Sequence, residues 1–204
     1  VRFNYDENYY NNQFSGIPVD GYTAIMKKMT AHPAIRVSLN KKFDASMDLS
    51  GYDHVFYTGP IDAYFNYQFG RLGYRTVTFK KEYANGDYQG AAQINYCEEK
   101  IPFTRITEHK HFAPWEQHDK TIYFTEYNNT AANILTISAD KTLLKLYREA
   151  AAQLQHVSFL GRLATYRYMD MHHVIDEALQ FAKTIGVNMA ANTPLPVFSN
   201  IETF

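Results

Sequence analysis

The sequence carries the stretch FLGRLATYRYMDMH at residues 159–172, which predicts the point where a strand gives way to a helix. The strand begins at Val157 and ends in a turn at the pair Gly161-Arg162. Apolar residues then recur with helical spacing: Val174, Ile175, Ala178, Leu179 and Ala182. The first N–H groups of a helix lack partners, so an anion binds readily there when a cation such as Arg162 stands beside it.

The same stretch also fits a turn with a purely structural role. In that alternative, Asp170 caps the helix through its carboxylate, and Tyr166 and Tyr168 are half-buried. Spacing alone leaves both interpretations open, so the rest of the chain has to choose between them.

Length and composition indicate an ordinary globular protein. The chain has 204 residues, enough for one large domain or two small ones, with 46% hydrophobic and 20% charged residues. A net charge of -1 gives no bulk attraction to nucleic acid or to an anionic membrane, so neither is expected as a partner.

No segment has the apolar length of a transmembrane helix. Cys97 is the single cysteine, which excludes an internal disulfide and suits a cytoplasmic location. The chain starts at Val1 without an initiator Met, a hint that it is cut from something longer.

Residues 74–127 alternate between apolar and polar side chains and predict an antiparallel meander of about four strands. One strand is expected over residues 103–112. The following side chains would share one face of it: Arg105, Thr107, His109 and His111. The two histidines could reach a metal together with Glu108 and Glu126, but no further ligand stands at dedicated spacing. No metal is therefore predicted.

Helices are expected at residues 22–29 and 141–154, and short strands at residues 35–39 and 54–57. The second of these strands ends in Thr-Gly-Pro, a place where backbone groups can line a ligand. Residues 189–204 show little periodicity and are expected to lie on the surface or to dock on a partner. The sequence has no Gly-x-Ser-x-Gly elbow and no Gly-rich phosphate loop, which argues against a serine hydrolase and a P-loop enzyme.

Five stretches, taken together, resemble one known family. They are VRF at residues 1–3, GIPVDGY at 16–22, YTGPID at 57–62, PFTRITEHKHF at 102–112, and GRLA through YMDMH at 161–172. In this order they resemble motifs of UDP-galactopyranose mutases, and the resemblance covers residues 1 to about 186. The family implies a flavoprotein isomerase that uses FAD and UDP-galactose and serves cell-surface polysaccharide biosynthesis.

The resemblance also implies that part of such an enzyme is missing. Family members begin with a Rossmann-type FAD domain, whose Gly-rich loop this sequence lacks. The implied fold is α+β, with an antiparallel substrate-facing sheet of about four to six strands, plus strands and helices that complete an FAD-binding α/β domain. The expected divisions are a mixed segment (1–72), the sheet (73–138), a helix-strand-helix return to the flavin domain (139–186) and a tail (187–204). Alone, the chain is expected to be inactive, with an incomplete FAD site and apolar surface that favours a homo-oligomer.

The family's chemistry assigns roles to particular residues. N5 of the reduced flavin attacks the anomeric carbon and expels UDP, and the resulting sugar–flavin adduct opens and recloses as the furanose. The resemblance implies that Arg105 pairs with the diphosphate, because its planar fork binds two oxygens at once. The catalytic residues it implies are Arg105, Tyr168 and Asp170. The substrate-binding residues are Tyr9, Asn95, Arg105 and Tyr168. The FAD-contacting residues are Arg162, Asp170, Met171 and His109.

The chain departs from the family pattern at two places. A second family arginine that clamps the diphosphate falls just before Val1, and Ile134-Leu135-Thr136 stand where the family has Tyr-Tyr-Pro. The second difference leaves one phosphate contact open. Two alternatives therefore remain: another flavoenzyme of the amine oxidase type, and a non-catalytic module that binds a sugar nucleotide or a protein.

Overall fold

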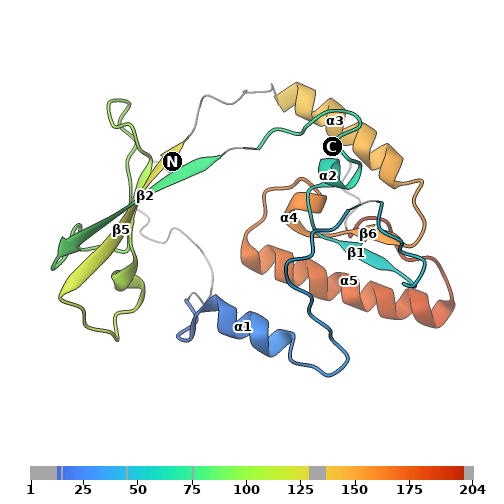
Figure 1. The fold of residues 1–204 in the computed structure, drawn as a ribbon, viewed down its shortest axis with the longest axis horizontal. Coiled ribbons are helices and arrows are strands. Elements are labelled where there is room, and N and C mark those ends of the chain that lie inside the picture. The colour runs from blue at the N-terminus through green and yellow to red at the C-terminus, as the bar shows by residue number, and fades with distance from the viewer. Residues whose placement is uncertain (1–12, 15, 45, 75, 129–136, 200–204) are drawn as a thin grey trace. The chain divides into compact units, whose positions relative to one another are not determined.

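The computed structural model describes residues 13–14, 16–44, 46–74, 76–128 and 137–199. Tyr9 and the stretch Ile134-Leu135-Thr136, to which the sequence assigned expectations, lie outside the described residues. The chain divides into two compact units (Figure 1), which we call the sheet unit and the helical unit. The sheet unit comprises Val1–Lys41 and Thr76–Asn129, and the helical unit comprises Lys42–Arg75 and Thr130–Phe204. The chain therefore crosses between the two units three times.

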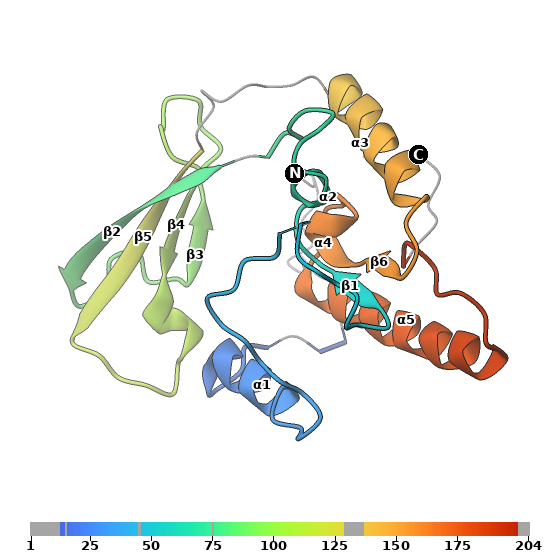
Figure 2. The same ribbon diagram turned by 45° about the vertical axis from the view of Figure 1, so that its right-hand side comes forward.

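The sheet unit contains a four-stranded antiparallel sheet (Figure 2), which confirms the number and the antiparallel pairing of the predicted strands. The predicted meander holds only for the last three strands, because the first strand pairs with the fourth and not with the second. Its strands are β2 (Val77–Asn85), β3 (Gln93–Asn95), β4 (Arg105–Glu108) and β5 (Lys120–Asn128). They lie in the order β2-β5-β4-β3, so β3 is an edge strand held only by β4. Alternation places Ile106, Glu108, Tyr123 and Thr125 on the buried face of β4 and β5.

Strand β4 is shorter than the sequence predicted. It ends at Glu108, and residues His109–Phe112 form a single 3-10 turn, η1. The expectation that His109 and His111 continue the strand face of Arg105 is therefore wrong. Lys110 and His111 both reach Asp87 of the β2–β3 connection, which neighbouring side chains of a strand could not do because they point to opposite faces.

The first helix of the sheet unit, α1 (Gly21–Met29), forms where it was predicted, but none of its residues is buried. The strand expected at residues 35–39 does not form. Ile35, Val37 and Leu39 are instead exposed, at 48%, 55% and 80% of their surface. An alternating segment becomes a strand only when a neighbouring strand can pair with it, and the described residues offer it none.

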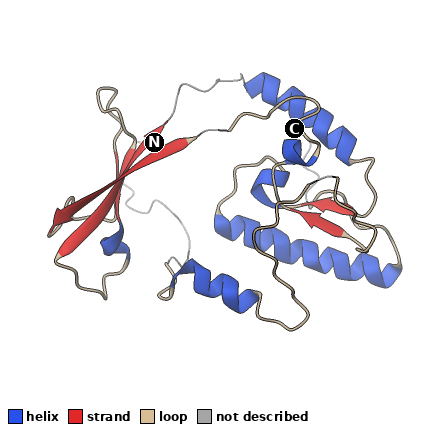
Figure 3. Cartoon of the chain, in the orientation of Figure 1, coloured by secondary structure: helices blue, strands red, loops and turns tan. Residues whose placement is uncertain are grey.

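The helical unit is built on two parallel strands, β1 (Val55–Tyr57) and β6 (Val157–Phe159), in which Val55 pairs with Val157. The helices α3 (Ile137–Ala151) and α5 (Met171–Ala191) lie on opposite sides of this pair in both ribbon views (Figure 3 shows the elements by type). Two short helices, α2 (Ile61–Tyr64) and α4 (Gly161–Ala164), follow the ends of β1 and β6.

The core of the helical unit is aromatic. Phe159 and Tyr147 are fully buried, and Tyr57 and Tyr64 pack edge-on against Phe159 with ring centroids 5.7 and 5.0 Å apart. Tyr57, Tyr64 and Tyr147, three of the 17 tyrosines in the sequence, therefore serve as packing groups in this core.

The C-terminal residues differ from the expected surface tail as far as they are described. Helix α5 continues to Ala191, and Phe198 then pairs in parallel with Phe159 of β6. The backbone N–H of Phe159 donates to Val197 at 2.7 Å, and the hydroxyl of Ser158 donates to the Pro196 carbonyl at 2.6 Å. This segment packs on its own chain because the open edge of β6 still has backbone groups to satisfy.

Within the described part of the chain, no helix combines the length and the apolar character needed to cross a membrane.

Candidate functional site

Arg105 is held between two neighbouring strands of the sheet unit. It stands at the start of β4, directly opposite Asn95 on β3 and Glu126 on β5. Its Nε donates a hydrogen bond to Asn95 Oδ1 at 2.9 Å, and its Nη1 lies 3.8 Å from Glu126 Oε2. The Arg105 side chain keeps 40% of its surface exposed. The guanidinium is thus oriented by its neighbours and still accessible to a ligand.

The sequence did not predict the contact between Glu126 and Arg105. The carboxylate of Glu126 is 17% exposed and also accepts from the hydroxyl of Thr104 at 3.3 Å. The missing information was strand register, since only the pairing of β4 with β5 sets Glu126 opposite Arg105. Because the pair is partly exposed, solvent screens it, and the guanidinium remains able to bind an anion.

His109 lies outside this group. Its exposed side chain belongs to η1, and its ring meets Phe124 edge-on with centroids 5.0 Å apart. Among the described residues, no hydrogen bond, ion pair or ring contact links His109 to Arg105 or Asn95. The FAD contact implied by the resemblance therefore stays a prediction.

Arg162 and Tyr168 form a second group, in the helical unit. The guanidinium of Arg162 lies over the Tyr168 ring, 4.4 Å from its centroid, and Nη1 donates to the Met169 carbonyl at 3.1 Å. Tyr168 is 83% exposed, so its hydroxyl and one ring face are open to solvent. The turn that brings these residues together uses Gly161 at φ +75°, a backbone conformation that favours glycine.

Asp170 and Met171 stand at the N-terminus of α5. Asp170 is the N-cap residue with extended backbone angles, but among the described residues its side chain makes no capping hydrogen bond. The structural alternative, in which Asp170 caps the helix and Tyr168 is half-buried, is therefore wrong on both points. Tyr166 fits it better, because its hydroxyl donates to the Gly73 carbonyl and burial raises its pKa to about 12.

Arg167 differs from Arg162 because it forms an ion pair with a carboxylate. Its Nη2 contacts Glu177 Oε2, and both side chains are about 15% exposed. Glu177 also accepts from the hydroxyl of Ser199, so this ion pair, which joins the segment before α5 to the helix, is satisfied. It lies on the wall of a hollow of about 720 Å³ that Tyr168 and Met169 also line. Arg162, by contrast, has no carboxylate partner within the described part of the chain.

This second group fits part of a flavin cofactor. The exposed ring of Tyr168, the Arg162 guanidinium and the first backbone N–H groups of α5 offer a flat surface with hydrogen-bond donors. The carboxylate of Asp170 would repel a phosphate and accepts instead from hydroxyl or N–H donors, such as those of a ribityl chain. The residues present are therefore compatible with FAD.

The fold and these groups define a class: a mixed α/β protein with an oriented arginine on an antiparallel sheet. The family model described as UDP-galactopyranose mutase matches residues 1–168. A probable UDP-galactopyranose mutase of Klebsiella pneumoniae is 42% identical over 98% of this chain and 53% of its own length. The chain therefore belongs to the UDP-galactopyranose mutase family.

Two further relatives help to define the range of the family. A dTDP-fucopyranose mutase of Escherichia coli is 39% identical over 90% of this chain and 52% of its own length. A UDP-galactopyranose mutase of Mycoplasma genitalium is 30% identical over 78% of this chain. The chain spans about half the length of the curated relatives it matches.

Proposed function

We propose that the chain is part of an FAD-dependent enzyme that interconverts UDP-galactopyranose and UDP-galactofuranose. The proposal rests on family membership together with one structural observation, the exposed guanidinium of Arg105 oriented by Asn95 and Glu126. A fixed fork of donors suits a diphosphate, which carries several oxygens and departs from the sugar as an anion. Arg105 would bind the diphosphate and stabilise the negative charge that develops on it.

The other residues have supporting roles in this proposal. Asn95 would orient Arg105 and face the sugar and flavin, while the exposed hydroxyl of Tyr168 would donate to a phosphate oxygen. Arg162, Asp170, Met171 and His109 would contact FAD, which in its reduced form supplies the nucleophile at N5. The role of Tyr9 on the phosphates rests on the resemblance alone. The remaining FAD contacts would come from a Rossmann-type half outside these 204 residues.

A second substrate is favoured by one observation, the 39% identity to a dTDP-fucopyranose mutase. Both sugar nucleotides carry a diphosphate, so the Arg105 group serves either one equally well. The two differ in the base, in the ribose 2′-hydroxyl and in the C6 hydroxyl of the transferred sugar, and neither of the groups described above selects for these features. Turnover of UDP-galactopyranose and of dTDP-fucopyranose by the complete, dithionite-reduced protein would separate the two substrates.

Calorimetric titration of the chain with UDP tests the Arg105 assignment directly. We expect Arg105→Ala to weaken binding about 30-fold, since losing a charged diphosphate partner costs about 2 kcal/mol. Arg71→Ala is the matched control, because Arg71 stacks on Tyr67 in the helical unit and lies in neither group. UDP binding that survives Arg105→Ala would contradict the assignment. Absence of turnover of either sugar nucleotide by the complete protein would favour the amine oxidase-type or non-catalytic alternative.

A further inference from the structure

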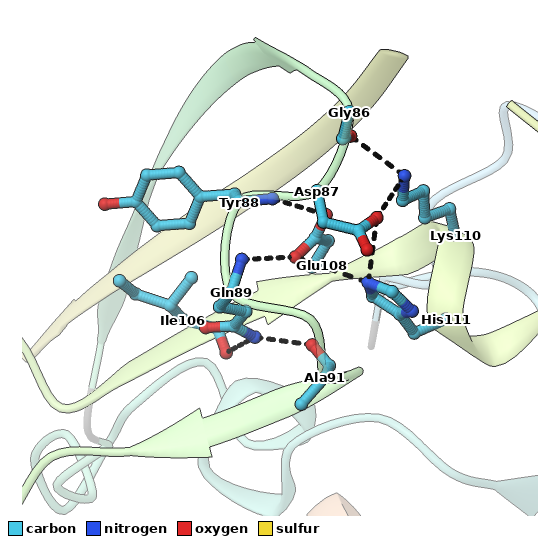
Figure 4. Close-up of polar contacts among 9 residues, drawn as sticks. All are labelled: Gly86, Asp87, Tyr88, Gln89, Ala91, Ile106, Glu108, Lys110 and His111. Carbon is cyan, nitrogen blue, oxygen red and sulfur yellow. Dashed lines mark hydrogen bonds and ion pairs between the residues drawn. The ribbon is translucent and has the colours of Figure 1, made fainter. Parts of the chain in front are cut away.

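Glu108 is a fully buried carboxylate at the end of β4, three residues after Arg105. Its two oxygens accept the backbone N–H groups of Tyr88 at 3.0 Å and Gln89 at 2.8 Å (Figure 4). Burial raises the pKa of Glu108, but the backbone hydrogen bonds from Gln89 and Tyr88, together with Thr121 and His111, lower the pKa to about 2. A buried carboxylate needs hydrogen-bond donors to offset its lost hydration, and the donors of Glu108 come from the connection that precedes β3.

The segment that Glu108 holds is the connection between β2 and β3, residues 86–92. The same short stretch of chain supplies further contacts to it, because Lys110 Nζ donates to the Gly86 carbonyl at 2.8 Å and also contacts Asp87 (Figure 4). The ring of Tyr88 also stacks on the ring of Tyr123 of β5, with the two ring centroids 3.7 Å apart. The connection is therefore fastened along its length to the strands beneath it.

Fastening this connection fixes the position of β3. The strand has three residues, lies at the edge of the sheet and pairs only with β4. The backbone N–H of Glu108 donates to the Ala92 carbonyl at 2.9 Å, and the side chain of Gln89 donates to the carbonyls of Ala91 and Ile106. The carboxylate of Glu108 thus holds the connection, and the backbone N–H of the same residue begins the β3–β4 ladder. Asn95 stands at the far end of that short ladder, opposite Arg105.

A metal is the competing use of these side chains, because one ligand atom each from Asp87, Glu108 and His111 could converge on an ion. The geometry disfavours it. The Lys110 ammonium already contacts Asp87, and both Glu108 oxygens are occupied by backbone donors. The cation of this cluster is a lysine, and its carboxylates bind the chain itself.

We propose that Glu108 is a positioning residue: by clamping residues 86–92 it sets β3 in register, and so places Asn95 where it orients the guanidinium of Arg105. Arg105 and Glu108 lie on opposite faces of β4 because they are three residues apart. Arg105 projects from one face of β4. Glu108, on the other face, holds the connection that leads into β3 and Asn95. The value of this arrangement for substrate binding rests on the proposed function, whereas the positioning itself does not.

The test uses the ¹⁵N-labelled 204-residue chain with Glu108→Gln and, as a matched control, Glu99→Gln, an exposed glutamate in the β3–β4 connection. Trp115, the single tryptophan, reports by its fluorescence that the sheet unit stays folded. In slightly acidic buffer, NMR follows the hydrogen exchange of the Arg105 Nε–H group, whose acceptor is Asn95. We expect Glu108→Gln to speed this exchange about fivefold or more, the loss expected for one hydrogen bond. Glu99→Gln should leave it unchanged.

The decisive comparison repeats Glu108→Gln in an Asn95→Ala background. Asn95→Ala already removes the hydrogen bond between Asn95 and Arg105. If Glu108 acts through Asn95, adding Glu108→Gln to this variant should not change the exchange rate of the Arg105 Nε–H group any further. An equal effect in both backgrounds, or no effect in the unaltered background, overturns the proposal. Should Glu108→Gln unfold the sheet unit, Lys110→Met loosens the same connection at Gly86 and Asp87 and is held to the same criteria.

Calorimetry with UDP on the same variants separates this inference from the proposed function. We expect UDP affinity to fall about fivefold in Glu108→Gln, in parallel with the Arg105 signal. If the Arg105 signal changes as expected and UDP affinity does not, the positioning role stands and the diphosphate assignment fails. If neither changes in folded protein, the positioning role fails.

Discussion

Arg105 and Asn95 stand directly opposite each other on β4 and β3, and their side chains are joined by a hydrogen bond of 2.9 Å from Nε to Oδ1. This bond fixes the rotation of the guanidinium plane before any ligand arrives. A side chain that is ordered in advance loses less conformational entropy on binding, so its contacts contribute more fully to affinity. The relationship supports the proposed role of Arg105 as a specific anion-binding group.

Replacing Arg105 with lysine keeps the charge and removes the fork. We expect UDP affinity to fall about tenfold, equivalent to about 1.4 kcal/mol. A lysine ammonium is a point charge and cannot donate to Asn95 and grip two phosphate oxygens in the same plane. Calorimetry measures the change, with Arg71→Lys as the control that should leave affinity unchanged. Equal affinities for Arg105→Lys and the unaltered chain would show that only charge matters.

The charge of Glu108 predicts how the sheet unit responds to acid. Its pKa of about 2 lies below the usual 4.5, so its stabilising effect is complete above pH 4.5 and is lost as the pH falls through 2. At neutral pH we expect Glu108→Gln to lower the free energy of unfolding by about 2 kcal/mol. Urea unfolding followed by Trp115 fluorescence should show this difference shrinking below pH 4.5. A difference that stays constant with pH would mean that the carboxylate charge is not what stabilises the connection.

The buried hydroxyl of Tyr147 is predicted to stabilise the helical unit. It donates to the Gly70 carbonyl and accepts the Phe69 N–H at 3.2 Å, and its residue has no exposed surface. Tyr147→Phe leaves both backbone groups without their partner, at a cost of about 2 kcal/mol. Circular dichroism at the helical wavelength should report a lower melting temperature. Tyr52→Phe is the control, because Tyr52 is 68% exposed, and an equal effect there would contradict the explanation.

The two parts of the Tyr168 side chain can be tested separately in the complete, dithionite-reduced protein. We expect Tyr168→Phe to lower kcat/KM for UDP-galactofuranose about tenfold, because the phosphate loses a hydroxyl donor while the ring remains under Arg162. Tyr168→Ala also removes the ring and should weaken retention of FAD. Tyr83→Phe is the control, since Tyr83 is another exposed tyrosine with a cation, Lys81, over its ring. Full activity of Tyr168→Phe would exclude the hydroxyl from phosphate binding.

Local patterns predicted much of the fold. The alternation in residues 74–127 gave the four antiparallel strands, and the change of period near Gly161 gave the end of β6 and the start of the helical segments. These features depend on near neighbours in the chain, which a sequence displays directly. The failed strand at residues 35–39 shows the limit, because strand formation also needs a partner that alternation does not reveal.

The candidate site was predictable only in its residue types. Motif resemblance pointed to Arg105, Asn95 and Tyr168, but the partnership of Arg105 with Glu126 depends on register between strands. Beyond the end of β4 at Glu108, Lys110 and His111 contact Asp87, which comes from the connection between β2 and β3. The exposure of Tyr168 depends on the turn at Gly161 and on Arg162 stacking over the ring. The contacts of Glu126 and Asp87 are long-range and lie outside any one window of sequence, whereas the stacking of Arg162 on Tyr168 is local but depends on the geometry of the turn.

The pairing of β1 with β6 has a consequence for the order in which the protein can fold during synthesis. Val55 finds its partner Val157 only after the whole sheet of residues 76–129 has left the ribosome. The sheet unit can therefore assemble first, while β1 waits with both edges unpaired and Phe56 uncovered. A ribosome stalled before β6 would carry a finished sheet followed by an unfinished helical unit, and the waiting strand is the segment on which a chaperone would be expected to act.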